Sequence, residues 1–436
     1  LSSHSVTRVQ LTLPVGSEFK EANLSLLIRQ DIYHGPLPLT VQNVPVVPIN
    51  WGWAVVRTTL DPDSNAWTRK LAKLYGGQEP IVAISQVGFD GASNTLITMP
   101  SLTLSNVSDL QSLSFAGLQG QFQVAPRGAK VRGKMTVTSL NVTGKSTTSE
   151  EQLASGSDQV KLSDLSLDVN QCKSAFDLMV GESSFRISEL RVQDRVIGDP
   201  ILVTNLTMIG ALSLQNAQQV AGEVVVQADQ IKPDKRSGSG SLRLALRNLD
   251  GATVLQLQQW QQKPSGKSDD PQAMNELLKL VKALLLGKPE FTVNTQAKLS
   301  DGVWHGQLVL NFQDFDVINS MQNPMGMLAV LEKGSADVTV SKTLLEKELN
   351  NLTDGQAAQQ IEGIMAAGFL WLEGDQYRSR TRFEGGNLFV NGKEVPMPAA
   401  ADNSTEEAPL ESEGSTENLH NSECSHRPGN TDDDRI

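Results

Sequence analysis

The chain has 436 residues, of which 20% are charged and only 5% aromatic, and its formal net charge is −12. Residues 401–436 hold ten acidic and two basic side chains, so the rest of the chain carries a net charge of only −4. The Lys and Arg residues are scattered and form no basic track, which excludes nucleic acid as the expected partner. The length allows two or three ordinary domains, or one extended β structure.

Cysteine content and hydropathy further limit the class of protein to which this chain can belong. The two cysteines, Cys172 and Cys424, lie far apart in the sequence and indicate no disulfide framework. No run of about 18 apolar residues occurs, so no helix is expected to span a membrane. The chain begins at Leu1, inside a strand pattern, and we expect that an upstream segment, a signal or an anchor, has been removed.

Residues 1–80 are predicted to form N-terminal strands and one short helix that join the sheet. Residues 5–13 and 23–32 alternate apolar and polar side chains and indicate an antiparallel pair. Residues 41–60 are apolar but are interrupted by two prolines, which favours an edge strand or a loop. Asp63 and Ser64 are placed to cap a helix that runs to Tyr75.

Residues 81–250 show a β pattern throughout, with turn-forming clusters between the strands. Long neighbouring strands with short links are typical of an antiparallel meander. Several of them exceed the usual length of five or six residues. The predicted strands are 81–88, 95–104, 112–124, 130–142, 159–169, 184–193, 201–214, 220–228 and 240–248.

A short phrase recurs within this meander: an aliphatic residue, Ser or Thr, a small polar or acidic residue, and then Leu. Strict alternation would place its first and fourth positions on opposite faces of the sheet. A bulge at the polar pair returns both to one face, so we predict a kinked strand that is repeated across a wide sheet. The copies begin at Val137, Leu162, Ile187 and Val203, with a looser one at Met99.

Residues 251–397 are predicted to supply helices and hairpins that pack on the sheet, and 398–436 to be a disordered acidic tail. The helices are expected at 252–262, from Pro271 to Gly287, at 316–332, after an N-cap at Ser341, and at 355–373. Hairpins are expected at 290–312 and 377–392. The predicted fold is mainly β (α+β): a long, twisted antiparallel β-meander with bulged strands, covered by several helices from the C-terminal half.

Residues capable of chemistry are scarce. His34 lies in a rigid turn and is either a ligand or general base, or, as we favour, a histidine packed at a strand end. The same two interpretations apply to His305. His420, Cys424 and His426 form only a weak metal-binding pattern. No nucleophile elbow, phosphate-binding loop or zinc-protease motif occurs. We therefore predict no catalytic, cofactor-binding or metal-ligating residue, and no enzyme.

Three segments resemble a known family, the bacterial YdgA-like proteins of Gram-negative bacteria, a domain of unknown function. They are 29–38 (Arg-Gln-Asp-Ile-Tyr-His-Gly-Pro-Leu-Pro), 363–368 (Gly-Ile-Met-Ala-Ala-Gly) and the closing hairpin 377–393. The resemblance covers about residues 1–397. It implies a periplasmic protein held at the inner membrane by an N-terminal segment that is absent from this chain, and it implies no catalytic residue.

Three functions remain open. The first is a non-enzymatic structural or interaction role in the bacterial cell envelope, with an envelope protein as partner or as a homodimer through a sheet edge. The alternative is a carrier or binder of lipid, or of another hydrophobic ligand, on the curved sheet. The apolar run Ile364–Leu372 could rest in a membrane interface, line a hydrophobic site, or be a buried helix, which we favour. A hydrolase is disfavoured by the scarcity of candidate residues.

Overall fold

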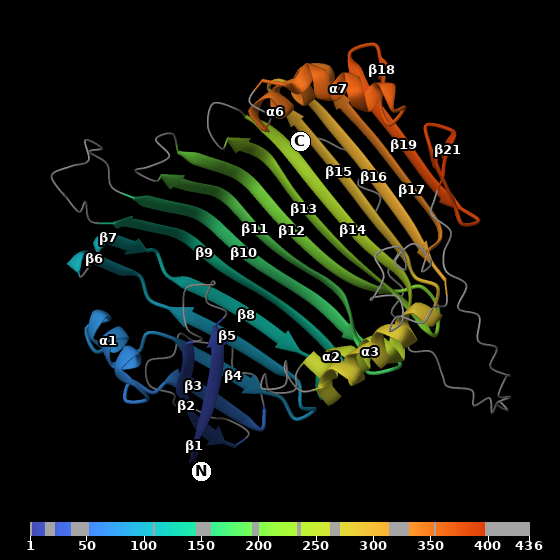
Figure 1. The fold of residues 1–436 in the computed structure, drawn as a ribbon. Helices are drawn as coiled ribbons and strands as arrows, with labels where there is room; N and C mark the ends of the chain where they lie inside the picture. The colour runs from blue at the N-terminus through green and yellow to red at the C-terminus, as the bar shows by residue number, and fades with distance from the viewer. Residues whose placement is uncertain are drawn as a thin grey trace, which may run out of the picture. The chain divides into compact units, whose positions relative to one another are not determined.

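The structure is a computed structural model that describes residues 2–13, 22–35, 52–107, 110–144, 158–193, 200–232, 237–261, 271–313, 331–352 and 355–396. The described strands form one 21-stranded sheet, in which every pair of neighbours is antiparallel (Figure 1). Most of the described helices come from the C-terminal half. The predicted fold class, mainly β with helices from that half, is confirmed.

The N-terminal strands follow one another in the sheet in chain order. They are β1 (Ser2–Leu13), β2 (Ala22–His34), β3 (Ala54–Leu60), β4 (Val82–Val87) and β5 (Ser93–Met99). The predicted pairing of the first two strands is confirmed. The prediction of an edge strand or loop at 41–60 is wrong for β3, which pairs on both sides; residues 36–51, with both prolines, lie outside the described part of the chain.

Two strands predicted as continuous are each divided. The stretch 95–104 breaks between β5 and β6 (Leu102–Val107), where Pro100 has no N–H to donate to a ladder. The stretch 112–124 divides into β7 (Leu110–Phe115) and β8 (Leu118–Val124) at Gly117, whose φ is 97°. One edge of β9 (Lys130–Gly144) then pairs first with β8 and further along with β7, so the two short strands together act as one neighbour.

The remainder of the sheet is a plain meander. From β9 each strand pairs with the next as far as β17, and β19 then pairs on its far edge with both β18 and β20. These strands are β10 (Gln159–Lys173), β11 (Met179–Gln193), β12 (Ile201–Leu214), β13 (Gln219–Lys232), β14 (Gly238–Asp250), β15 (Glu290–Leu299), β16 (Gly302–Phe312), β17 (Leu331–Ser341), β18 (Trp371–Glu373), β19 (Gln376–Glu384), β20 (Asn387–Val390) and β21 (Lys393–Val395).

The described α-helices differ from the predictions mainly at their ends. They are α1 (Ala66–Leu74), α2 (Gly251–Gln261), α3 (Pro271–Leu286), α6 (Lys342–Leu352) and α7 (Ala357–Ala366). Asn65, not Asp63 or Ser64, caps α1, because its side chain accepts from the Thr68 N–H. The helix predicted at 355–373 ends early, at Ala366, two residues before Gly368 with its φ of 80°, and Trp371–Glu373 is a strand.

Two further predictions are partly outside the described residues. Of the helix predicted at 316–332, residues 316–330 cannot be described, and Leu331 and Glu332 belong to β17. The tail at 398–436 likewise lies outside the described part. The division into four segments stays a prediction; the described strands of the first three segments belong to one sheet.

The recurring phrase forms a crease that crosses the strands in register. The first residue of each copy faces the fourth residue of the next copy, so that Leu162 and Leu165 of β10 pair with Leu140 and Val137 of β9. The same register continues through β11 to β12. The third position is left-handed in two copies, with φ of 49° at Asp164 and 51° at Asn205. The structure therefore confirms the predicted kink in β10 and β12.

The helices pack near opposite ends of the strands (Figure 1). At one end, Val254 and Leu255 of α2 and Leu284 of α3 cover a cluster of Leu178, Val220 and Leu249. At the other end, Leu344 of α6 and Ile361 of α7 form a cluster with Val340 and Tyr377. The largest described parts of the core thus lie at the strand ends, and the centre of the sheet lies between the two helix pairs.

A trough on the apolar face of the sheet

The strand register assigns each side chain to one face of the sheet. Residues directly opposite each other on neighbouring antiparallel strands point to the same face, and the next residue along points to the other. Gly210 of β12, for example, faces Ser183 of β11 and Val224 of β13. Extending these pairings from strand to strand shows which residues form continuous rows across the sheet.

Three neighbouring rows on one face contain no charged residue from β8 to β17. The first is Val124, Val131, Gln171, Gly181, Leu212, Gly222, Leu246, Phe291, Leu310 and Gly334. The second is Phe122, Gly133, Val169, Ser183, Gly210, Val224, Leu244, Val293, Leu308 and Ala336. The third is Gly120, Met135, Leu167, Phe185, Met208, Val226, Leu242, Thr295, Gly306 and Val338. We call this surface the apolar face.

The few polar side chains in these rows have partners within the face. Gln171 donates its side-chain N–H to the Ser183 hydroxyl at 3.2 Å. The indole N–H of Trp304, from the next row on the same face, donates to the Thr295 hydroxyl at 2.8 Å. Since these groups are already hydrogen-bonded, the face does not require a polar ligand.

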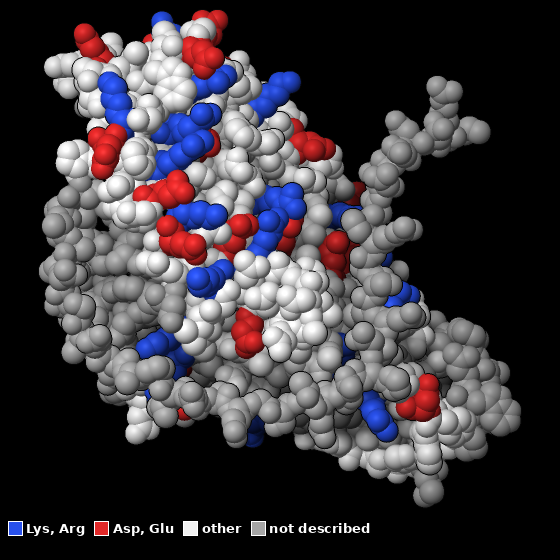
Figure 2. Space-filling view, turned by 90° about the vertical axis from the view of Figure 1, so that its right-hand side faces the viewer, with Lys and Arg blue, Asp and Glu red and all other residues white. Residues whose placement is uncertain are grey.

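The opposite face is polar and carries the charged residues of the same strands. Arg243 pairs with Glu223 at 2.8 Å, and Arg380 pairs with Asp337 at 2.7 Å, in both cases across neighbouring strands. The hydrogen bond and charge of Glu223 raise the pKa of Arg243. Figure 2 shows positive and negative side chains interspersed among the described residues of one side of the molecule, with no patch of a single sign. The sheet is therefore amphipathic, with one solvated face.

Both helix pairs pack on the apolar face, because their clusters contain residues of its rows and of the strand ends that continue them. Leu212 and Leu246 contact the cluster under α2 and α3, and Val340 belongs to the cluster under α6 and α7. Between the two pairs, Met208 and Val224 each expose 42% of their surface. We call this part of the apolar face the trough; the helix pairs form its walls and the sheet its floor.

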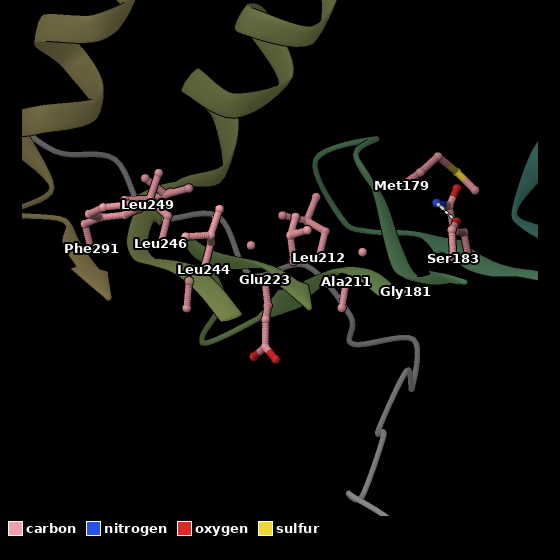
Figure 3. Close-up of a pocket in the computed structure, with 15 residues that line it drawn as sticks. Met179, Gly181, Ser183, Ala211, Leu212, Glu223, Leu244, Leu246, Leu249 and Phe291 are labelled. Carbon is pink, nitrogen blue, oxygen red and sulfur yellow. Dashed lines mark hydrogen bonds between the residues drawn. The ribbon is translucent and has the colours of Figure 1, made fainter. Parts of the chain in front are cut away.

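The trough contains a cavity where its floor includes three glycines. This cavity of about 520 Å³ lies over β10 to β15, with Gly181, Gly210 and Gly222 in its lining. A Cβ atom built on Gly210 would meet no atom within 4 Å. In Figure 3, Leu212, Leu246 and Leu249 project to one side of the sheet, and Ala211 and Glu223 project to the other. Missing side chains therefore create the hollow.

A second cavity, of about 450 Å³, lies beside α7 and is lined by Glu346, Ile361, Glu362, Met365 and Tyr377, among others. The Tyr377 hydroxyl donates to Glu346 at 3.1 Å, and burial, followed by this hydrogen bond, raises the pKa of Tyr377. On α7, Ile361 is 4% exposed and Ile364 40% exposed. The prediction that the apolar run Ile364–Leu372 is a buried helix is wrong: Ile364, Phe369 and Leu372 expose 40%, 45% and 40% of their surface, because only the side of α7 that carries Ile361 packs against the sheet.

The histidines singled out from the sequence do not come together. The ring Nε2 of His34, the last residue of β2, lies 2.9 Å from the Ser3 hydroxyl. His305 lies in β16 on the polar face. His420, Cys424 and His426 are outside the described residues. Within the described part of the chain, no cluster of three or more His, Cys, Asp or Glu could hold a metal ion, and no helix has the length and apolarity needed to cross a membrane.

The comparisons with known proteins give a family and no more. Residues 1–398 match a family described as a bacterial protein of unknown function (DUF945). No curated protein matches the chain, and no solved structure matches it. The resemblance to a bacterial domain of unknown function is therefore confirmed at the level of that family.

Proposed function

Because the chain belongs to the DUF945 family of bacterial proteins, whose function is unknown, its role must be inferred from its geometry, and we propose that the trough binds the acyl chains of lipids. The observation that carries this proposal is the absence of charged residues from three rows of the apolar face between β8 and β17. Acyl chains offer no hydrogen-bonding groups, and the polar side chains of this face already bond to one another.

Exposure of the trough supports a ligand over a simply filled core. Large apolar side chains such as Met208 and Val224 are exposed beside each other, on adjacent strands and on a face whose strand ends are packed against helices. A contiguous exposed apolar surface of this kind marks a binding site. The cavity over Gly210 adds a hollow of about 520 Å³, within the range of ligand pockets.

The cellular setting is part of the proposal. The resemblance of residues 29–38 and 377–393 to YdgA-like proteins supports a periplasmic location with attachment to the inner membrane. A lipid-binding role there is non-enzymatic, consistent with the scattered positions of His34 and His305. We propose no cofactor and no catalytic residue.

A structural or interaction role in the envelope is the second candidate. The observation that favours it is the long edge strand β1, which pairs with β2 and with no other described strand. Val6 in this strand exposes 58% of its surface. Edge strands present unpaired backbone groups that can pair with a second copy of the chain. In this case the protein would be a homodimer, with β1 at the interface.

Lipid analysis of the purified protein tests the first proposal. We expect native mass spectrometry, with lipid extraction of protein purified in mild detergent, to find bound acyl-chain lipid. Met208→Glu places a carboxylate on the apolar face and is expected to lower the retained lipid by about half or more, because an unpaired charge is costly there. Thr207→Glu, one residue away on the polar face, is the matched control and should retain the wild-type amount.

Two outcomes would contradict the proposal. One is a wild-type protein that is free of lipid; if it is also dimeric, the interaction role replaces lipid binding. The other is equal lipid content in Met208→Glu and in the wild type, since lipid would then be bound elsewhere.

A further inference from the structure

We infer that the trough holds several lipids at once and serves as a path along which they move across the strands. This inference rests on the proposed lipid binding and adds a capacity and a direction to it. A carrier for a single lipid needs one pocket of matching size. The trough is long, uniform along its length and bordered by helices, as expected of a site that holds several lipids.

The trough is much longer than one lipid. Neighbouring strands lie about 4.8 Å apart, so the nine steps from β8 to β17 span roughly 43 Å. The hydrocarbon core of a bilayer is about 30 Å thick, so the acyl chains of one leaflet reach about 15 Å. The charge-free rows also continue through Thr95 of β5 to Ser85 of β4. About three lipids could therefore lie one after another along the described trough.

The trough is also uniform along this length. None of the three rows from β8 to β17 contains a charged side chain that would hold a lipid headgroup at a fixed position. The polar side chains Gln171, Ser183 and Thr295 are engaged in bonds within the face. Since no position is marked as a stopping point, a bound acyl chain can slide from one strand to the next.

The two helix pairs border the apolar face near the ends of the strands. The helix pairs α2–α3 and α6–α7 lie near the two ends of the strands, and the rows run perpendicular to the strands (Figure 1). The pair α2–α3 borders the path beside β13 and β14, and the pair α6–α7 borders it near the other strand ends, beside β16 and β17. Acyl chains can lie across the strands, between the walls.

Gly210 is a position at which an added side chain would block the path. It lies in the middle row on β12, about halfway between β8 and β17, and a side chain there would enter open space. Gly210→Phe is thus expected to fill the hollow without displacing neighbouring side chains. Ala211→Phe adds the same ring on the polar face and is the matched control. Val224→Trp, directly opposite Gly210, is a second blocking variant.

The experiment counts lipids and measures transfer with the full chain. Native mass spectrometry is expected to find more than one phospholipid per wild-type chain, and fewer but not zero in Gly210→Phe. Transfer of a fluorescent phospholipid between phosphatidylethanolamine–phosphatidylglycerol vesicles is expected to slow about tenfold in both blocking variants. An acyl chain that passes the added side chain meets a free-energy cost similar to that of overpacking a protein core. Ala211→Phe should transfer at the wild-type rate.

The outcomes separate this inference from the proposed function. A single lipid per wild-type chain, or unchanged transfer in both Gly210→Phe and Val224→Trp, would overturn the path and leave lipid binding intact. No lipid on the wild-type chain would overturn lipid binding and the path together. Thermal unfolding of each variant shows that it is folded, and two blocking variants at one point of the path keep the test decisive if one of them does not fold.

Discussion

The ring of Phe122 lies directly over Gly133, its partner on the neighbouring strand: a Cβ atom built on Gly133 would be 2.1 Å from a ring carbon of Phe122. Gly210 lies in the same row, four strands from Phe122, and a Cβ atom there would meet nothing within 4 Å. Two glycines on one face thus have different roles. One makes room for a side chain of the protein, and the other leaves room for something else.

This difference predicts opposite effects on stability. Gly133→Val forces a clash with Phe122 and is expected to lower the free energy of unfolding by about 1–3 kcal/mol. Gly210→Val has space and removes the entropic cost of glycine in a strand, so it should be neutral or stabilising by up to about 1 kcal/mol. Urea unfolding of the two variants checks the prediction. Equal destabilisation by both would show that the hollow at Gly210 is filled.

Trp304 provides an intrinsic probe of the trough. Its indole lies on the apolar face, is hydrogen-bonded to Thr295, and is 36% exposed. Phospholipids with brominated acyl chains are expected to quench its fluorescence, because bromine quenches tryptophan only at close range. The quenching should be smaller in Trp304→Phe and unchanged in Trp53→Phe, which removes an indole that precedes β3. Equal quenching in wild type and Trp304→Phe would place the acyl chains elsewhere.

At the crease, we expect the strand to tolerate glycine without loss of stability. Asp164 has a φ of 49°, a conformation that costs a residue with a Cβ about 1–2 kcal/mol and costs glycine nothing. Asp164→Gly is therefore expected to be neutral or stabilising, whereas Asp164→Val should lose about 2 kcal/mol, because β-branched residues fit this region worst. Denaturant midpoints measure both. A stable Asp164→Val variant would mean that β10 can straighten at this point.

The contact between Tyr377 and Glu346 predicts a pH dependence. Burial and the hydrogen bond raise the pKa of Tyr377 above its usual 10.0, so the folded state holds the proton more tightly than the unfolded state does. The resulting stabilisation is fully present below pH 10 and is lost as the pH rises further. At neutral pH, Tyr377→Phe should lose about 1 kcal/mol of stability through the missing hydrogen bond.

Above pH 10, the stability of the wild type is expected to approach that of Tyr377→Phe, which has no proton to lose at this position. Melting temperatures measured between pH 8 and pH 11 test this convergence. A difference between the two proteins that stays constant over this range would show that folding leaves the pKa of Tyr377 unchanged.

Local patterns predicted much of the fold because strand formation and bulges depend on neighbouring residues. The predicted strand 201–214 matches β12, and the phrase that begins at Leu162 predicted the bend at Asp164. Helix ends were predicted less well. The apolar run after Gly363 gives no local sign that the chain leaves α7 at Ala366 and forms β18, since pairing with β19 decides this.

By itself, the sequence determined that this chain is a β-meander with amphipathic strands, because a period of two in side-chain polarity assigns one face of each strand to an apolar environment. The tertiary structure alone decided that these faces join into one continuous surface. That surface depends on the register of each strand with its neighbours, and a slip of one residue would place the opposite set of side chains on it. The hollow at Gly210 depends on residues that are distant in the sequence, among them Gly181 of β11 and Leu246 of β14. No pattern within a single strand records these relationships, because they are contacts between strands.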